Sequence, residues 1–228
     1  MPNTGLKKEH MVDYAEYMDL HAKLERTPGF FHYYRFAMED LETRFSMLNE
    51  YFSLAGEQSP IVDIRTRLKT FDSIFEKLKR RGFPVTVQSI TENLYDVAGV
   101  RVICPFIDDV YCVADTLLKQ EDIVLIEKKD YIMFPKNNGY RSLHLLIELP
   151  VVLPPGRRMI KAEVQLRTIA MEFWANLEHK MRYKRDMDPA LLKGISDELK
   201  ECAVISNELD RRMQQIHYRI EGEEEEEE

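Results

Sequence analysis

The sequence has 228 residues with 32 basic and 40 acidic side chains, which give a formal net charge of −8 at pH 7. Seven of the acids lie in the final run, residues 221–228, so the rest of the chain is nearly neutral. Near neutrality argues against nucleic-acid binding, which needs a broad basic surface. Three cysteines without a C-x-x-C pair predict neither a disulfide framework nor a zinc site, and the lack of an 18-residue apolar run predicts no membrane span. We therefore expect a cytoplasmic protein with a disordered acidic tail at residues 221–228.

Two helices are predicted in an N-terminal region, residues 1–58. Residues 8–25 carry a weak helical pattern that ends at Thr27-Pro28-Gly29. A stronger pattern follows, in which apolar side chains recur every three or four residues: Phe31, Tyr34, Met38, Leu41, Phe45, Leu48 and Phe52. This aromatic stripe favours a core or subunit interface over a ligand site.

A further helix is predicted from Ser59-Pro60, which read as an N-cap and first helical residue, to a stop at Gly82. Its apolar face is Ile61, Ile64, Leu68, Phe71, Phe75 and Leu78. The opposite face carries Arg65, Lys69, Ser73, Lys77 and Arg80. That face is either a solvated surface or a wall that binds phosphates. On an ideal helix Arg67 lies about 160° from Lys69, so both reach one ligand only if the helix start is irregular.

A buried strand is predicted over Val97–Cys104, with the carboxylate of Asp96 at its entrance. Gly99 within that strand indicates a close backbone approach. A helix over residues 107–120 and a second strand over residues 123–126 follow.

The stretch Pro135–His144 is the densest in polar chemistry. Asn137-Asn138-Gly139 tolerates positive φ and predicts a sharp turn. From there Tyr140, Ser142 and His144 alternate with Leu143, Leu145 and Ile147, as in a strand with one face on a core. The polar face is expected to line a cleft.

A hairpin at residues 150–156 leads to a strand over residues 160–167, whose polar face is Lys161, Glu163, Gln165 and Arg167. The two polar faces can lie side by side on one sheet. Separated carboxylates at Asp96 and Glu163 can share a divalent cation while basic residues hold polyphosphate, which suits phosphoryl-type transfer. The sequence has no P-loop and no dinucleotide or kinase motif, so side chains must form the cradle.

A helix over residues 168–184 contains Trp174, Glu178 and His179. Beyond Pro189, heptad-like apolar spacing predicts a long C-terminal helix, residues 185–220. We expect it to pack on the N-terminal aromatic helix or on another subunit.

Several motifs occur in the order found in one known family. They are Asp96-Val97-Ala98-Gly99-Val100-Arg101, Lys129-Asp130-Tyr131-Ile132, Pro135-Lys136, Asn138 to His144, Glu163-Val164-Gln165-Leu166-Arg167-Thr168, and Trp174 through Glu178-His179 to Tyr183-Lys184. Together they make residues 59–184 resemble the synthetase domain of the RelA/SpoT family, and the lack of a His-Asp dipeptide makes the chain similar to its small alarmone synthetases.

The resemblance implies an α/β (α+β) fold with a nucleotidyltransferase-like mixed β-sheet flanked by helices. It also implies a GTP diphosphokinase that transfers the β,γ-pyrophosphate of ATP to the 3′-hydroxyl of GTP or GDP. The products would be AMP and the (p)ppGpp alarmone of the stringent response.

By position, the resemblance makes Asp96 a Mg²⁺ ligand and Glu163 a second ligand or the general base. It implies that Tyr140 stacks on guanine and that Arg67 and Arg101 sandwich adenine. The expected contacts of the ATP phosphates are Lys69, Ser73, Lys77 and Arg80; those of the acceptor nucleotide are Lys136, Arg141, His144 and Gln165. Gln165 stands where long family members often carry an acid, and His144 and His179 could instead be structural.

Two other readings stay open. The same fold could pyrophosphorylate transfer-RNA ends or adenine nucleotides, as toxin-like relatives do, or it could be a catalytically silent nucleotide-binding assembly module. The terminal helices and the resemblance together predict a homotetramer. Nucleic acid is expected only as a regulator.

Overall fold

The computed structural model describes residues 4–27, 29–54, 58–154, 156–182 and 189–227. Its helices are α1 (Thr4–Glu25), α2 (Phe30–Leu54), α3 (Phe71–Arg81), α4 (Val87–Asn93), α5 (Ile107–Leu118), α6 (Ile169–Arg182) and α7 (Pro189–Glu227). Its strands are β1 (Asp63–Leu68), β2 (Ala98–Cys104), β3 (Val124–Asp130), β4 (Leu143–Leu153) and β5 (Gly156–Thr168). Tyr183 and Lys184 of the family motifs lie outside the described residues.

The strands form a single mixed sheet in the order β1-β2-β5-β4-β3. The β2–β5 pair is parallel, whereas β1–β2, β5–β4 and β4–β3 are antiparallel. The long β4–β5 hairpin thus places the two predicted polar strands next to each other in the middle of the sheet. The prediction of a mixed sheet flanked by helices is confirmed.

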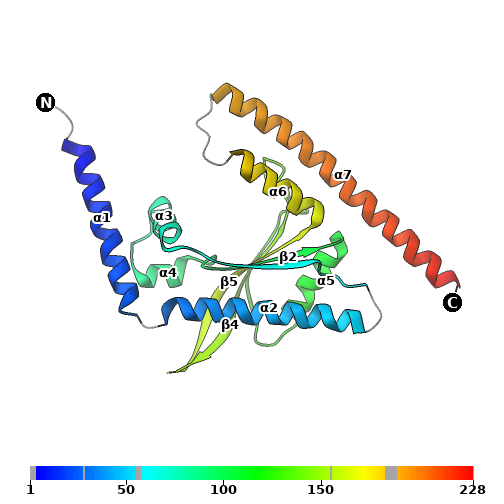
Figure 1. Cartoon of the computed structure of the whole chain (residues 1–228), viewed down its shortest axis with the longest axis horizontal. Helices are drawn as coiled ribbons and strands as arrows, with labels where there is room; N and C mark the ends of the chain where they lie inside the picture. The colour runs from blue at the N-terminus through cyan, green and yellow to red at the C-terminus, as the bar shows by residue number, and fades with distance from the viewer. Residues whose placement is uncertain (1–3, 28, 55–57, 155, 183–188, 228) are drawn as a thin grey trace.

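Helix α2 packs across one face of the sheet, where it contacts β1, β2, β4 and β5 (Figure 1). Its buried side chains include Tyr34, Met38, Leu41 and Phe45, so the predicted aromatic stripe belongs to the core. The inward-facing residues of β2, β4 and β5 and the apolar side of α5 complete this core. The other face of the sheet is therefore left for polar side chains.

The predicted helix from Ser59 to Gly82 is wrong in its first half. Residues 63–68 form β1, which pairs with β2, and α3 begins only after the N-cap Thr70, whose hydroxyl accepts a hydrogen bond from the Ser73 N–H. Ser59 does not cap a helix here, because its hydroxyl bonds to the Asn49 side chain at the end of α2. Pairing with β2 satisfies the backbone and overrides the local Ser-Pro signal.

This correction removes a geometric difficulty. Alternate residues of a strand share one face, so Arg65, Arg67 and the following Lys69 project to the same side of the sheet. On a helix Arg67 and Lys69 would have been about 160° apart. Both can therefore serve one ligand without an irregular helix start.

The turn at residues 137–139 is confirmed, and so is the β4–β5 hairpin, but its connection is shorter than predicted because residues 150–153 pair with residues 156–159. Gly139 adopts a φ of 89°, the left-handed region that glycine tolerates. The strand predicted over residues 123–126 is longer, because β3 runs from Val124 to Asp130 along β4.

Helix α7 packs against α6 and α5, on the opposite side of the sheet from α2 (Figure 1). The expectation that it packs on the N-terminal aromatic helix is therefore wrong within the described chain. The helix also continues to Glu227, through most of the acidic run for which we expected disorder. Glutamate is a good helix former, which favours this continuation. No helix in the described ranges has the length and apolar character needed to cross a bilayer.

Candidate active site

A cleft with a volume of about 510 Å³ opens on the face of the sheet that α2 leaves free. Its lining residues come from β1, β2, β5 and the segments beside them: Arg65, Thr66, Arg67, Lys69, Asp96, Gly99, Val100, Arg101, Glu163 and Gln165. Strand register explains the set, since Arg67, Gly99 and Glu163 lie in one row across the sheet and Arg65, Arg101 and Gln165 in the next. The sheet thus brings guanidinium groups and carboxylates to one surface.

Asp96, just before β2, is tied to two lysines from different elements. Its Oδ2 lies 3.0 Å from Lys69 Nζ and 2.6 Å from Lys77 Nζ. Burial alone would raise the pKa of this carboxyl group, but the two lysines outweigh burial and hold its pKa below the usual value. Asp96 is therefore ionised at neutral pH.

The second carboxylate oxygen of Asp96, Oδ1, is buried and has no hydrogen-bond partner among the described residues. An unpartnered buried anionic oxygen fits a cation ligand. Glu163 lines the same cleft, and Mg²⁺ is commonly held by one or two carboxylates together with substrate phosphates and water. Groups of three or more candidate metal ligands are absent from the described residues, so a metal here would depend on such a mixed shell.

Five side chains beside the cleft form a closed ring of hydrogen bonds. Arg167 Nη2 donates to the Tyr140 hydroxyl and, at 3.1 Å, to Gln165 Oε1. The Tyr140 hydroxyl lies 2.9 Å from His144 Nε2, and His144 Nδ1 lies 3.1 Å from Glu163 Oε1. Gln165 Nε2 closes the ring with a 2.9 Å bond to Glu163 Oε2. Every member therefore fixes its two neighbours.

The charges in this ring follow from burial and pairing. Burial is the main reason that the pKa of His144 falls below its ordinary value, and Glu163 only partly opposes it. A neutral His144 donates from Nδ1 to the carboxylate and accepts the Tyr140 hydroxyl proton at Nε2. Burial would raise the pKa of Glu163, but hydrogen bonds from His144 and Gln165 keep it below its usual value. Glu163 is thus an ionised carboxylate with a fixed orientation.

Aromatic rings and a lysine surround the turn before β4. Lys136 Nζ lies 4.5 Å from the ring centroid of Tyr131 and 4.7 Å from that of Tyr140. Arg167 also lies over Tyr140, with Cζ 5.0 Å from the ring centroid. Burial near these rings lowers the pKa of Lys136. The Tyr140 ring is therefore held among cations in this structure, and its stacking on guanine stays a prediction.

The structure gathers most of the residues predicted for the ATP side. Arg67, Lys69, Asp96 and Arg101 line the cleft, and Lys77 reaches it through Asp96. Ser73 lies in the first turn of α3, where its hydroxyl accepts a hydrogen bond from Thr70 at 2.9 Å. Arg80 differs, since it is exposed on the last turn of α3 and does not line the cleft.

Arg141 is not part of the ring of hydrogen bonds, although it lines a separate cavity together with Lys136 and Gly139. It follows Tyr140 in an extended segment, so its side chain projects to the other side. There Arg141 is buried, with Nη2 2.9 Å from Asp210 Oδ2 of α7 and Nη1 bonded to Asn207. Arg141 therefore contacts α7 in this structure, and its contact with the acceptor nucleotide stays a prediction.

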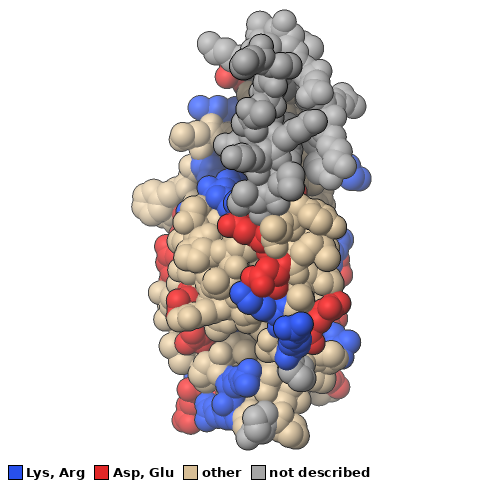
Figure 2. All heavy atoms as spheres, turned by 90° about the vertical axis from the view of Figure 1, so that its left-hand side faces the viewer, with Lys and Arg blue, Asp and Glu red and all other residues tan. Residues whose placement is uncertain are grey.

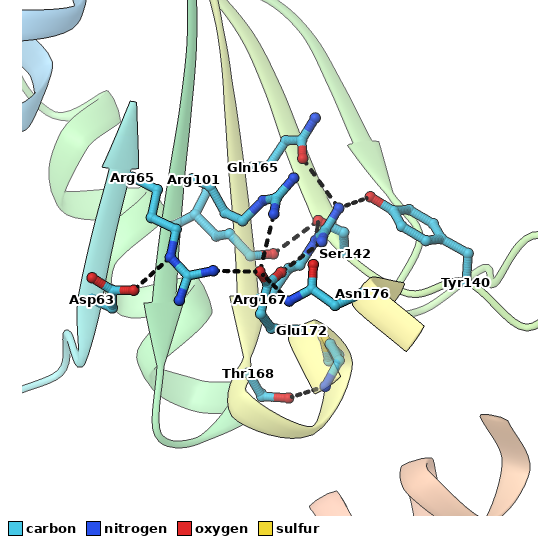
Figure 3. Close-up of polar contacts among 12 residues, drawn as sticks. Asp63, Arg65, Arg101, Tyr140, Ser142, Gln165, Arg167, Thr168, Glu172 and Asn176 are labelled. Atoms are coloured by element: carbon cyan, nitrogen blue, oxygen red, sulfur yellow. Dashed lines mark hydrogen bonds and ion pairs between the residues drawn. The ribbon is translucent and has the colours of Figure 1, made fainter. Parts of the chain in front are cut away.

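The sequence reading missed Glu172 as a site residue. Its buried carboxylate accepts hydrogen bonds from Arg65, Arg101, Arg167 and Asn176 (Figure 3). The alternation over residues 63–69 could have revealed Arg65 as a cleft residue. Nothing in the local sequence reveals Glu172, because its partners are up to 107 positions away along the chain.

Comparison with known proteins shows the family of the chain. A family model described as a region found in RelA / SpoT proteins matches residues 66–188. The chain belongs to the RelA/SpoT family. The motif resemblance is therefore confirmed, and the matched region holds nearly all of the cleft and ring residues described above.

Two similar RelA/SpoT relatives from Bacillus subtilis are covered by this chain over most of their own length. GTP pyrophosphokinase YwaC of Bacillus subtilis is 47% identical over 180 residues, which cover 79% of this chain and 85% of YwaC. Small alarmone synthetase 1 of Bacillus subtilis bound to its product pppGpp superposes with a TM-score of 0.78 at 30% identity, over 86% of this chain and 99% of the synthetase. The same enzyme bound to AMPCPP gives a TM-score of 0.73 at 29% identity, over 87% and 99%.

Proposed function

We infer that this RelA/SpoT chain is a GTP pyrophosphokinase, a GTP diphosphokinase that makes the alarmone (p)ppGpp. It transfers the β,γ-pyrophosphate of ATP to the 3′-hydroxyl of GTP or GDP and releases AMP. The observation that carries this inference is the pairing of a cleft containing Asp96 with a fixed, ionised Glu163 at its edge. Relatives that share this fold carry the same activity in their names.

The ATP side of the cleft suits a polyphosphate. Lys69 and Lys77 converge on it, and Arg65, Arg67 and Arg101 bring three guanidinium groups to adjacent strands. Lysines act as point charges on phosphate oxygens, while guanidinium planes also stack on bases. We assign ATP to this side, with Arg67 and Arg101 against adenine and Lys69, Lys77 and Ser73 toward the phosphates.

The acceptor side is assigned to the ring of hydrogen bonds. Tyr140, Lys136 and His144 lie next to Glu163, so an acceptor stacked on Tyr140 would bring its ribose toward that carboxylate. Gln165 holds the second oxygen of Glu163 and contributes to its orientation. These roles place the acceptor hydroxyl and the ATP phosphates on two sides of one carboxylate.

In the transfer step, the 3′-hydroxyl oxygen bonds to the β-phosphorus of ATP, and the bond from that phosphorus to the oxygen bridging to the α-phosphate breaks. AMP leaves with that oxygen, and Glu163 accepts the hydroxyl proton. A carboxylate in this position contributes typically about 10²- to 10⁴-fold. Because the pKa of Glu163 is held low, this carboxylate is a weak base. Its contribution to the rate should come mainly from orienting the 3′-hydroxyl and from accepting the proton late in the transfer step.

We propose Mg²⁺ as the cofactor, with Asp96 and Glu163 as the residues that would hold it. The unpartnered Oδ1 of Asp96 fits this role. When bound, Mg²⁺ offsets the charge of the polyphosphate and polarises the transferred group. Lys69 and Lys77 balance Asp96 on its other oxygen.

One assay tests the function. Purified protein is incubated with Mg²⁺ and ATP labelled in the γ-phosphate, and separately with GTP, GDP or transfer RNA. We expect the label on a guanine nucleotide and release of AMP. Label on RNA alone would favour the toxin-like reading, and no transfer would favour a silent binding module. Basic and acidic side chains are interspersed on the face shown in Figure 2, which supports a nucleotide acceptor over RNA.

We also propose a homotetramer in the cytoplasm. Helix α7 exposes apolar side chains at helical spacing: Val204, Ile205, Leu209, Met213, Ile216 and Ile220. A helix face of this kind is commonly covered by another subunit. Light scattering should give about four times the 27.0 kDa mass of one chain, and a single species of 27.0 kDa would contradict the proposal.

A further inference from the structure

The carboxylate of Glu172 accepts hydrogen bonds from arginines of three different strands. It belongs to the first turn of α6, and the residue is only 6% exposed. Its Oε1 accepts from Arg65 Nη1 at 3.2 Å, Arg101 Nη1 at 3.0 Å and Asn176 Nδ2 at 2.9 Å, and its Oε2 accepts from Arg167 Nη1 at 2.7 Å. Figure 3 shows the three guanidinium groups pointing at this single carboxylate from β1, β2 and β5.

Two of these arginines belong to the ATP side. Arg65 and Arg101 lie opposite each other in the β1–β2 pair, and both line the cleft. Arg101 is about one-third exposed, so part of its guanidinium remains open to a ligand after the contact with Glu172. Without that contact the long side chain would be free to leave the cleft.

The third arginine belongs to the acceptor side. Arg167 is buried, and its other terminal nitrogen donates to Tyr140 and Gln165. The path from Glu172 to the acceptor platform is therefore Glu172, Arg167 and Tyr140, in direct contact throughout. Because Gln165 bonds to Glu163, the same arginine also supports the carboxylate assigned as base.

One buried carboxylate against three arginines leaves excess positive charge, which suits a site that receives two polyphosphates. Burial opposes the ionised form of Glu172, but Arg101 and Arg167 hold its pKa below the usual value. Arginine side chains lose much rotamer entropy when they are fixed, so fixing them before substrates bind lowers the cost of binding.

We propose that Glu172 is a positioning residue that holds Arg101 at the ATP subsite and Arg167 at the acceptor subsite, and so joins the two halves of the site. The assignment of subsites rests on the function proposed above. Glu172 touches neither substrate in this scheme. It acts through Arg101, with Arg65 beside it, on the ATP side and through Arg167 on the acceptor side.

Nucleotide affinities test this independently of turnover. Isothermal titration with AMPCPP and, separately, with GDP is carried out in the presence of Mg²⁺ on wild-type protein and on Glu172→Gln. We expect both dissociation constants to rise at least about fivefold, because glutamine keeps the shape but loses the charge that fixes three guanidinium groups. Asp63→Asn is the matched control, since among the described residues the Asp63 carboxylate bonds to Arg65 alone, at 2.7 Å, and it should leave both affinities within about twofold.

A double-mutant cycle separates positioning from a general structural role. In an Arg167→Met background, Glu172→Gln should no longer weaken GDP but should still weaken AMPCPP; in an Arg65→Met/Arg101→Met background the reverse should hold. Equal weakening in every background, or unchanged affinities in Glu172→Gln, would overturn the proposal. If Glu172→Gln does not fold, Glu172→Asp keeps the charge with a shorter reach and should weaken both nucleotides.

The outcomes also distinguish this proposal from the function on which it rests. A wild-type protein that binds both nucleotides without transferring pyrophosphate would contradict the function and leave the affinity test in force. A wild-type protein that binds neither would overturn both.

Discussion

Gly99 of β2 lies directly opposite Glu163 of β5 in the parallel pair at the centre of the sheet. A Cβ at Gly99 would lie 3.4 Å from the backbone oxygen of Arg67, and its side chain would enter the cleft beside the Glu163 carboxylate. The neighbouring pairs along these strands carry full side chains, such as Arg101 opposite Gln165. The absence of a side chain at Gly99 therefore leaves open space at the base of the cleft, which is called the floor of the site below.

Replacing Gly99 with valine should block this floor. We expect nucleotide binding and transfer to fall by about 100-fold, because misplacement of bound reactants by about an ångström costs that much. Valine favours strands, so the melting temperature should change little. Gly156→Val is the control and should keep full activity, because Gly156 begins the neighbouring strand β5 and a Cβ there would meet no atom within 4 Å. Equal activity in both variants would mean that no ligand occupies the floor.

Replacing Glu163 with glutamine should nearly abolish turnover and leave the fold intact. The amide can still accept the hydrogen bond from His144, but it cannot take the proton of the 3′-hydroxyl. We expect kcat to fall by about 10²- to 10⁴-fold with the melting temperature preserved. A variant that keeps more than about a tenth of the rate would contradict the role as base. Glu127→Gln, on the exposed edge strand β3, is the control.

The pH dependence should follow His144. Its pKa in the folded protein lies below the ordinary value of about 6.5, so the unfolded chain takes up the proton first as pH falls. The folded state therefore loses stability below about pH 6.5 and is unaffected above it. Protonation also removes the acceptor for the Tyr140 hydroxyl, so kcat/KM should decline on the acid side with a midpoint below 6.5.

The variant His144→Asn tests this assignment. Asparagine can still donate to Glu163, but it does not titrate, so the acid decline should shift to lower pH. Profiles of kcat/KM from pH 5 to 8, with the melting temperature recorded at each pH, provide the measurement. The same midpoint in both proteins would assign the titration to another group.

Replacing Asp96 with asparagine should lower turnover without lowering the affinity for ATP. In Asp96→Asn, Lys69 and Lys77 lose their carboxylate partner and become free for phosphates, so AMPCPP should bind without Mg²⁺ at least as tightly as to the wild type. Transfer should fall about 100-fold or more, since metal assistance is worth several kcal/mol and each 1.36 kcal/mol is tenfold. Full activity of Asp96→Asn across a Mg²⁺ titration would remove Asp96 from the metal site.

The sequence predicts the sheet well where one face is apolar and the other polar. The alternation over residues 160–167 and the Asn-Gly turn before Leu143 determine β5, β4 and their shared polar surface. Prediction failed over residues 59–68, where apolar residues fit both a helical and a strand period and a Ser-Pro pair imitated a helix start. Pairing with β2, which lies more than 30 positions later, decided the outcome.

The residues of the site are likewise predictable from the sequence only where they belong to recognisable motifs. Asp96, Glu163 and Lys69 carry recognisable chemistry in recognisable motifs, and the cleft brings them together. The partners that hold the arginines are not local. Arg65 and Arg101 reach Glu172 only after α6 has packed on the sheet, and Arg141 reaches Asp210 only after α7 has packed there. Such contacts depend on tertiary packing and leave no periodic signal in the chain.

The Arg141–Asp210 ion pair should determine how firmly α7 holds the turn before β4. Both side chains are buried, and Asp210 also accepts a 2.8 Å hydrogen bond from Thr168. Burial lowers the pKa of Arg141 and raises that of Asp210, so desolvation opposes the charged form of each partner. Removing only one partner leaves a buried unpaired charge. Asp210→Leu should therefore destabilise the fold by about 3–5 kcal/mol.

Replacing both partners should restore most of that loss. In Arg141→Met/Asp210→Leu no charge is left buried, and apolar side chains can fill the space between β4 and α7, so we expect stability within about 1–2 kcal/mol of the wild type. Urea unfolding of the two singles and the double measures the coupling. Because the side chain of Arg141 bonds to Asn207 and Asp210 of α7, the double variant should also keep its KM for GDP within about twofold. A large rise in that KM with restored stability would return Arg141 to the nucleotide site.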